Sequence, residues 1–304
     1  MKPQITILPS HKIDTTKWDN CVAKNDEGLI YSTTNYLNFM AENWSGLVVE
    51  DYAAVMPLPW KKKLGIRYLY TPPFTQQLGY IGDNLLAVNQ LQQALQAFIK
   101  YGDYLFNYKN TYLYESLNLT ERSNYIINLN QPYQAIKNGY SKIFKSDLGK
   151  AFTNNLTYTT TDNFEATLTF YQQYNKKNLK HISNKCYASF LELCEYFFSK
   201  KKLVVRHVLN QNKIMVSSVI LLEDRNRFYN IINYTTIEGR KLKANFFLYD
   251  NLFEEFSESP MLFDFEGSDL TGVKHFYKNF GANNQPYFQW HFNQLPWPLN
   301  YLKQ

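Results

Sequence analysis

One order of secondary-structure elements occurs twice along the 304 residues, and it restricts the chain to mixed α/β folds. Apolar residues spaced three to four apart predict helices, and short β-branched or aromatic runs between turn residues predict strands. In the first half we expect a strand at 5–10, helices at 14–24 and 34–42, strands at 46–49, 53–59 and 65–70, a helix at 84–101 and a strand at 112–116. In the second half we expect a strand at 156–160, helices from 162 and at 187–198, strands at 203–209, 213–222 and 228–234, a helix at 242–256, a strand at 261–265 and a helix at 271–280.

The doubled order predicts two similar domains, because a single core rarely grows beyond about 250–300 residues. A strand at 125–129 and a lysine-rich helical segment lie between the halves, so we place the boundary within 148–155. The domains are then 1–148 and 149–304. Two tandem α/β units leave a cleft where they meet, which is a favoured place for a ligand.

Composition excludes several other classes of protein. No run approaches the roughly 20 apolar residues that span a bilayer, and the first residues lack the apolar region of a signal peptide. Cys21, Cys186 and Cys194 are too few for a disulfide framework, so a cytoplasmic location is expected. The net charge of +6 suits an anionic ligand or an RNA. The lysine clusters at 61–63, 176–177 and 200–202 are interpreted as solvated turns or helix ends.

Three segments carry a resemblance to a known family. They are IYSTTNYLNFM at 30–40, PLPWKKKLGIRYLYTPPFTQQLGYIG at 57–82 and FDFEGSDLTGVKHFYKNFGANNQPYF at 263–288. Together with the element order, they resemble the FemAB-like group of acyl- and aminoacyltransferases, in which the GNAT acyl-CoA N-acyltransferase fold is present twice. The resemblance implies two GNAT-like domains in tandem, the first binding the acceptor and the second the acyl donor.

The resemblance implies that Tyr277, followed by Gly281 and Ala282, is the acid that protonates the leaving group. A tyrosine hydroxyl with a pKa near 10 is a sensible donor to a thiolate. The alternative is that Tyr277 packs as helix core beside Phe276 and Phe280. Glu266 is a candidate general base at the end of a strand, and the alternative is a structural turn in which it caps the next helix. Asp264 and Ser268 are interpreted as turn and cap residues.

The resemblance places acyl-CoA, as co-substrate, at the start of the helix predicted from 242. Backbone N–H groups and the helix dipole favour an anion there. The residues expected to hold the donor are Tyr234, Arg240, Lys241, Lys243, Ala244 and Asn245. Lys243 stands where the family has a glycine, so this segment is alternatively a solvated helix cap that binds no CoA.

Acceptor binding is implied near the loop TPPFTQQLG, and its candidate residues are Tyr70, Gln76, Gln77 and Tyr80. The two amides can hydrogen-bond a polar acceptor; the alternative is that the loop only packs against the second domain.

The sequence offers little support for other chemistry. His181, His207 and His275 are isolated, and no metal site is expected. The leading hypothesis is transfer of an acyl group from an acyl-CoA-like donor to an amine. A second is aminoacyl transfer from charged tRNA to a cell-wall precursor; Tyr277 argues against it, because the tRNA-using relatives resemble F-K-x-x-F there. A third is a binding protein that kept the fold and lost the chemistry.

Overall fold

The computed structural model describes residues 3–83, 85–175, 182–267 and 269–301. His181 and Ser268 lie outside the described residues. The chain forms two compact units, each with its own mixed α/β layers. Unit 1 comprises Met1–Arg122 and Pro286–Gln304, and unit 2 comprises Ser123–Gln285. No helix of the described part is both long and apolar enough to cross a membrane.

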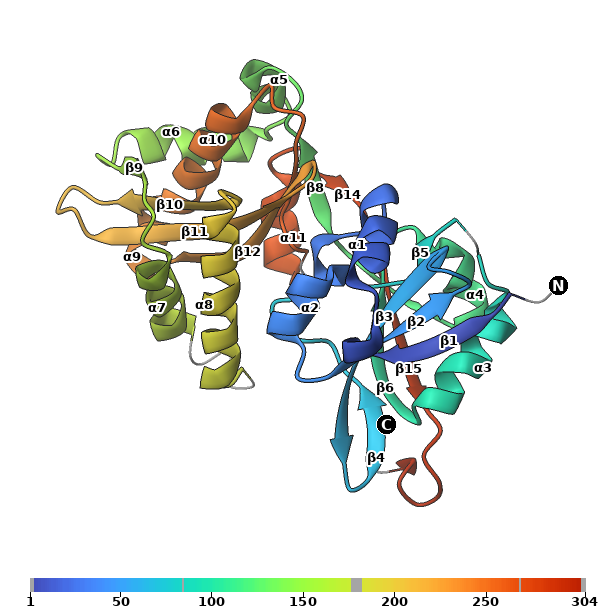
Figure 1. Cartoon of the computed structure of the whole chain (residues 1–304). Helices are drawn as coiled ribbons and strands as arrows, with labels where there is room; N and C mark the ends of the chain where they lie inside the picture. The colour runs from blue at the N-terminus through green and yellow to red at the C-terminus, as the bar shows by residue number, and fades with distance from the viewer. Residues whose placement is uncertain (1–2, 84, 176–181, 268, 302–304) are drawn as a thin grey trace. The chain divides into compact units, whose positions relative to one another are not determined.

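Unit 1 is built on a sheet with the strand order β1-β2-β3-β4-β6-β15-β7, with β5 paired to β3 (Figure 1). Its strands are β1 (Ile5–Pro9), β2 (Trp44–Val49), β3 (Ala54–Lys63), β4 (Ile66–Leu69), β5 (Ile81–Gly82), β6 (Tyr101–Phe106), β7 (Thr120–Arg122) and β15 (Tyr287–Asn293). Its α-helices are α1 (Thr15–Lys24), α2 (Thr34–Met40), α3 (Val88–Phe98) and α4 (Tyr114–Leu117).

Unit 2 is built on a sheet with the strand order β14-β8-β13-β12-β11-β10-β9. Its strands are β8 (Tyr125–Asn128), β9 (Thr157–Thr160), β10 (Leu203–Leu209), β11 (Met215–Asp224), β12 (Arg227–Thr235), β13 (Leu262–Asp264) and β14 (Asn283–Asn284). Its helices are α5 (Tyr133–Asn138), α6 (Lys142–Phe152), α7 (Phe164–Asn175), α8 (Asn184–Ser199), α9 (Ile237–Lys241), α10 (Ala244–Phe256) and α11 (Thr271–Lys278). Helices α6 and α10 lie on one face of this sheet, and α7 and α8 lie on the other (Figure 1).

The mixed α/β class and the doubled order of elements are confirmed, apart from one strand. The segment predicted as a strand at 112–116 is helical, since it is covered by a 3-10 turn over Asn110–Leu113 and by α4. Leu113 and Leu117 are both buried and lie four residues apart, a helical spacing that the aromatic run around them hides. The strand is β6, which begins where the preceding helix was expected to end.

The division of the chain differs from the boundary expected at 148/149. Helix α6 runs through that position, and its residues Phe144, Leu148 and Ala151 are buried in the unit 2 core against α10. Strand β15 leaves the second half and pairs with β6 and β7 in unit 1. The local residue pattern of a strand does not depend on which unit's sheet it joins, so the sequence does not predict that β15 belongs to unit 1. The binding roles expected for the two domains stay predictions.

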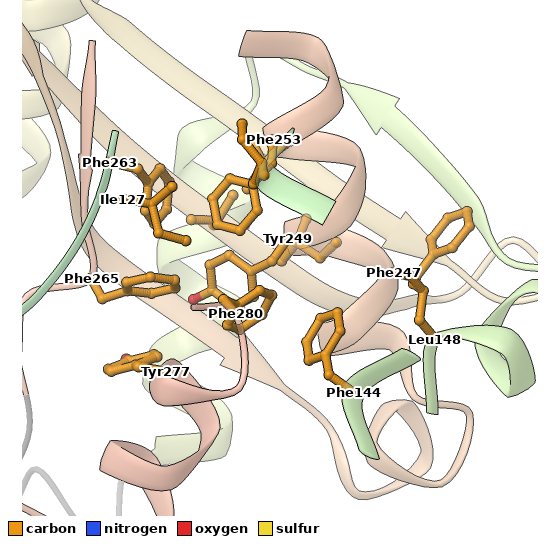
Figure 2. Close-up of a cluster of buried hydrophobic side chains, with 14 of the residues drawn as sticks. Ile127, Phe144, Leu148, Phe247, Tyr249, Phe253, Phe263, Phe265, Tyr277 and Phe280 are labelled. Atoms are coloured by element: carbon orange, nitrogen blue, oxygen red, sulfur yellow. The ribbon is translucent and has the colours of Figure 1, made fainter. Parts of the chain in front are cut away.

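Aromatic side chains fill the unit 2 core (Figure 2). Tyr249 and Phe253 of α10 pack edge-to-face against Phe263 of β13, with ring centroids 5.9 and 5.2 Å apart. Phe280, after α11, packs against Phe144 of α6 at 4.3 Å. This cluster ties α6, α10 and α11 to one end of β13, and it therefore fixes the loop that follows β13.

The buried pair of Thr167 on α7 and His207 on β10 makes stability sensitive to pH. Thr167 Oγ1 and His207 Nε2 lie 2.6 Å apart, and burial lowers the pKa of His207 below 6.5. The unfolded chain takes up a proton near that pH while the folded chain does not. We therefore expect the free energy of unfolding to fall as the pH drops through about 6.5, as measured by urea titration at about pH 7.5 and about pH 5.5. The same slope in His207→Gln would contradict this assignment.

Candidate active site

In the unit 2 sheet, the pairing of β12 with β13 stops where β13 ends. Strands β12 and β13 pair in parallel only from Arg227 opposite Leu262 to Tyr229 opposite Asp264. Beyond Tyr229, β12 continues to Thr235 with no strand of the described part paired on the β13 side. Loops at the carboxyl ends of neighbouring parallel strands are favoured ligand sites in α/β sheets. We take this open end as the candidate site.

Glu266 lies in the loop after β13, and its backbone is held in an unusual conformation. Its φ is 65°, in the left-handed region that non-glycine residues rarely adopt, and Gly267 follows with φ 59°. The Glu266 N–H donates to Asp264 Oδ1 at 2.9 Å. The side chain is half-buried. The next helix, α11, has Leu270 as its N-cap, so Glu266 does not cap it, and its role as a base stays a prediction.

Tyr277 of α11 lies inside the aromatic core. Its side chain is 5 % exposed, and its ring stacks on Phe265 with centroids 4.3 Å apart (Figure 2). The hydroxyl hydrogen-bonds the Asn233 side chain on β12. Burial, together with the charges of Glu266 and Asp264, raises the pKa of Tyr277 well above 10. This packing favours the core role that the sequence left open, while the hydroxyl still reaches the open stretch of β12.

A buried ion pair lies in the strands next to the loop that follows β13. Arg227 and Asp264 lie on paired strands, both are almost fully buried, and Nη1 lies 2.6 Å from Oδ2. Asn124 Nδ2 donates to the same carboxylate at 3.2 Å, and Arg227 Nη1 also donates to Gln285 Oε1 at 3.1 Å. Asp264 was interpreted as a turn residue, and its partner Arg227 was not identified from sequence.

The start of α10 lies just beyond the open stretch of β12. Thr236 caps the short helix α9 by accepting from Gly239 N–H at 2.9 Å. The first intrahelical hydrogen bonds of α10 run from Phe246 and Phe247 N–H to Lys243 O, at 3.1 and 3.2 Å. The N–H groups of Ala244 and Asn245 therefore precede the helical ladder, as they do at helix ends that bind anions.

The three basic residues at this helix start are not equivalent. Arg240 and Lys241 are exposed, and the Arg240 guanidinium lies 5.9 Å from the centre of the Tyr234 ring. Lys243 adopts φ 61°, the conformation that the expected glycine supplies. Its Nζ lies 2.9 Å from Asp147 Oδ2 on α6, so Asp147 already compensates its charge. Although burial opposes the shift, hydrogen bonds from Lys150 and Lys243 lower the pKa of Asp147.

Tyr234 ends in an aromatic stack on the α7 side of the sheet. Tyr174 stacks on it with centroids 5.6 Å apart, and Phe170 packs edge-on at 5.8 Å. Tyr234 and Arg240 lie close to each other, and the Ala244 side chain is buried. Tyr174 and Asn233 are the neighbours that sequence reasoning missed, because each follows an ordinary helix or strand pattern.

The four acceptor candidates of the first half are placed mostly inside unit 1. Gln77 is fully buried, donates from Nε2 to Gln76 Oε1 at 2.7 Å and accepts from Tyr108 N–H at 3.1 Å. Gln76 and Tyr80 are buried as well. Tyr70 is half-buried, accepts from Glu42 N–H at 2.8 Å and carries Lys61 Nζ over its ring at 4.6 Å. Three of the four therefore pack and hydrogen-bond within unit 1 itself, and their role in acceptor binding stays a prediction.

The two histidines considered from the sequence and described in the structure are not part of this candidate site. His275 is exposed on α11, and His207 pairs with Thr167. Among the described residues, no group of three or more His, Cys, Asp and Glu side chains is arranged to hold a metal ion.

No protein family model and no curated protein matches this chain in sequence. Solved structures do match. FemX aligns over 99% of this chain and 100% of its own, with a TM-score of 0.67 and 13% identity. The C-terminal domain of a putative lysylphosphatidylglycerol synthetase from Agrobacterium fabrum aligns over 95% and 94%, with a TM-score of 0.57 and 10% identity. A GCN5-related N-acetyltransferase from Sphaerobacter thermophilus aligns over 97% and 98%, with a TM-score of 0.51 and 10% identity. These likenesses confirm the predicted fold.

Proposed function

For a chain with the FemX-like tandem GNAT fold, we propose that it transfers an acyl group to an amine from a donor whose carrier bears phosphates, with acyl-CoA as the leading candidate. The observation that carries the proposal is the open stretch of β12, which is followed by the short helix α9 and then by the basic start of α10. The extended arm of the donor's carrier can pair with the free edge of a strand. The phosphates at the end of that arm need N–H groups and cations. Unit 2 holds both, joined in the chain by α9.

The residues divide this work. Arg240, Lys241 and the N–H groups of Ala244 and Asn245 hold the phosphates, and Lys243 shapes the loop through its contact with Asp147. The backbone of β12 after Tyr229 binds the arm. Acyl-CoA supplies the activated thioester carbonyl that the amine attacks; the C–N bond forms, the C–S bond breaks, and CoA leaves as a thiolate that takes up the proton the amine gave to Glu266.

Glu266 accepts the proton that the amine loses, because its carboxylate lies in the loop at the open end. Tyr277 acts as a positioning residue: it orients Asn233 on the open stretch of β12, and its raised pKa keeps it protonated. Tyr70 is the remaining acceptor candidate in unit 1, where its ring and hydroxyl are half-buried.

The phosphate site predicts a separation of KM from kcat. In Arg240→Ala and Lys241→Ala we expect KM for acyl-CoA to rise about tenfold or more, since a hydrogen bond to a charged group contributes about 1.5–3 kcal/mol. We expect kcat to change little, because the lost contacts bind substrate and transition state equally. Steady-state kinetics with a panel of acyl-CoAs and amines measures both. Lys200→Ala, a basic variant at the end of α8, is the matched control.

A second donor, charged tRNA, is favoured by one feature. At the position of the expected glycine, Lys243 holds a side chain that is paired to Asp147, so close approach of a pyrophosphate to this backbone is more hindered than in the family pattern. Turnover with aminoacyl-tRNA and none with any acyl-CoA would select this donor. Calorimetry that detects acyl-CoA binding without turnover of any amine would instead select the non-catalytic binding protein.

A further inference from the structure

One end of the unit 1 sheet gathers positive charge and exposed apolar side chains. The hairpin between β3 and β4 contributes Lys61, Lys62, Lys63 and Leu64, and Lys100 precedes β6. Lys62, Lys63 and Lys100 are exposed. Lys61 lies 3.2 Å from Glu42, so its charge is compensated, and the other lysines supply the excess.

The tip of this hairpin presents a leucine to solvent. Leu64 is 91 % exposed and has φ 49°, and Gly65 follows with φ 79°. Both residues of a tight hairpin turn adopt positive φ, a position that asparagine or glycine normally occupies. A leucine there costs free energy twice, because its backbone has positive φ and its apolar side chain is in water. This indicates that a binding partner covers the side chain.

The C-terminal segment places more large apolar side chains on the surface. Trp297 is 82 % exposed and Tyr301 is 74 % exposed. Leu299 is exposed as well. The segment is an ordered turn, because Asn293 Nδ2 donates to Asn300 O at 2.9 Å and Tyr301 N–H donates to Pro298 O at 3.1 Å.

The strand register brings the hairpin and this turn to the same end of the sheet. Lys61 lies opposite Tyr68, Tyr68 lies opposite Tyr101, and Tyr101 lies opposite Asn293, the last residue of β15. The backbone continues this row, since Gln294 N–H donates to Lys100 O at 2.7 Å. Figure 1 shows β4 and the segment after β15 at this end of unit 1. We call Lys62, Lys63, Leu64, Lys100, Trp297 and Tyr301 the basic-aromatic edge.

We propose that the basic-aromatic edge binds the surface of an anionic phospholipid membrane. Lysines near such a surface are attracted by its negative potential, and tryptophan and tyrosine prefer the headgroup region. A leucine at a hairpin tip inserts below the headgroups. An RNA would need the lysines but would leave Leu64 in water, so the membrane accounts for more of the edge. The proposal stands independently of the acyl-transfer reaction.

Sedimentation of the full chain with vesicles tests the proposal. We expect binding to vesicles of phosphatidylglycerol and phosphatidylcholine, weakening with added salt and absent on phosphatidylcholine alone. Each lysine near the surface contributes about fivefold to the partition coefficient, so Lys62→Glu with Lys63→Glu is expected to abolish binding. These side chains are exposed, so the variant is expected to fold normally, which thermal unfolding checks.

The apolar part has its own variants. Leu64→Asn suits the turn better and is expected to weaken binding without loss of stability. Ile214→Asn is the matched control, because Ile214 is exposed beside Lys213, another positive-φ residue, at the β10–β11 turn of unit 2. Trp297 is the most exposed of the chain's five tryptophans that the structure describes, so a blue shift of emission on binding is expected and should disappear in Trp297→Ala.

Several results would overturn the proposal. Equal binding to uncharged vesicles would contradict the electrostatic attraction. Unchanged binding in the lysine double variant would show that the basic-aromatic edge is not the binding surface. Filter binding in which RNA is held more tightly than anionic vesicles, through the same lysines, would assign the edge to nucleic acid instead. Loss of binding in the Ile214→Asn control would show that the effect is not specific to unit 1.

Discussion

Replacing Glu266 with glutamine is expected to lower kcat of amine acylation by about 10²–10⁴-fold, the usual contribution of a general base. The substitution keeps the size of the side chain and its backbone conformation, and it removes only the ability to accept a proton. KM for the donor should change little, because the proposed phosphate site lies beyond the other end of the open stretch of β12. Single-turnover measurements with saturating donor, across a pH series, report the chemical step directly.

Glu258 supplies a matched control for this prediction. It is also a glutamate with positive φ, at 61°, but its side chain is exposed and it lies in the turn before β13, away from the open end of the sheet. Glu258→Gln is expected to retain full activity, and both variants should unfold at the same denaturant concentration as the parent. If Glu266→Gln also retained full activity, the loop after β13 would be a structural turn, as the alternative interpretation of the sequence holds.

Asp264→Asn is expected to lower the free energy of unfolding by about 3–5 kcal/mol, because it leaves the buried guanidinium of Arg227 without a counter-charge. The substitution keeps one oxygen that can accept from the Glu266 N–H, but its new NH2 group faces the donors of Arg227 and Asn124, so the loop that carries the candidate base is expected to shift. Urea denaturation measures the stability, and activity under native conditions reports the second effect.

Two further variants separate the buried charge from packing. Replacing both partners by apolar residues, Arg227→Met with Asp264→Leu, should recover most of the stability, since an intact buried pair is often no better than a hydrophobic contact. Glu42→Gln breaks the more exposed pair with Lys61 and should cost less than about 1 kcal/mol. A loss in Asp264→Asn as small as that in Glu42→Gln would mean that water reaches the buried pair.

The predictions differ in what they depend on. Stability losses in Asp264→Asn and the pH response of His207 follow from burial and contact geometry alone. The Glu266 and Arg240 results depend on the proposed reaction. If the stability predictions hold and the Glu266 and Arg240 predictions fail, the chain is a folded GNAT-like protein with another function.

Local patterns in the sequence were enough to predict most elements of both units. Helix α10 was expected from the spacing of Phe246, Tyr249, Phe253 and their neighbours, and β12 from the run at 228–234. Such patterns succeed because a helix or strand buries one face of itself at a fixed period, whatever it packs against. Glu266 was noticed because it follows the end of a predicted strand, and Arg240 because it matches the family's loop pattern just before a predicted helix.

Tertiary structure alone decided the pairings between distant segments. The exchange of β15 into unit 1, the Arg227–Asp264 pair with Asn124, and the contact of Lys243 with Asp147 join residues that are far apart in the chain. Each partner taken alone has an unremarkable sequence context: a short strand, a turn aspartate or a helix-end lysine. Their pairing depends on which faces meet once both sheets have formed, and that condition leaves no periodic trace in the order of amino acids.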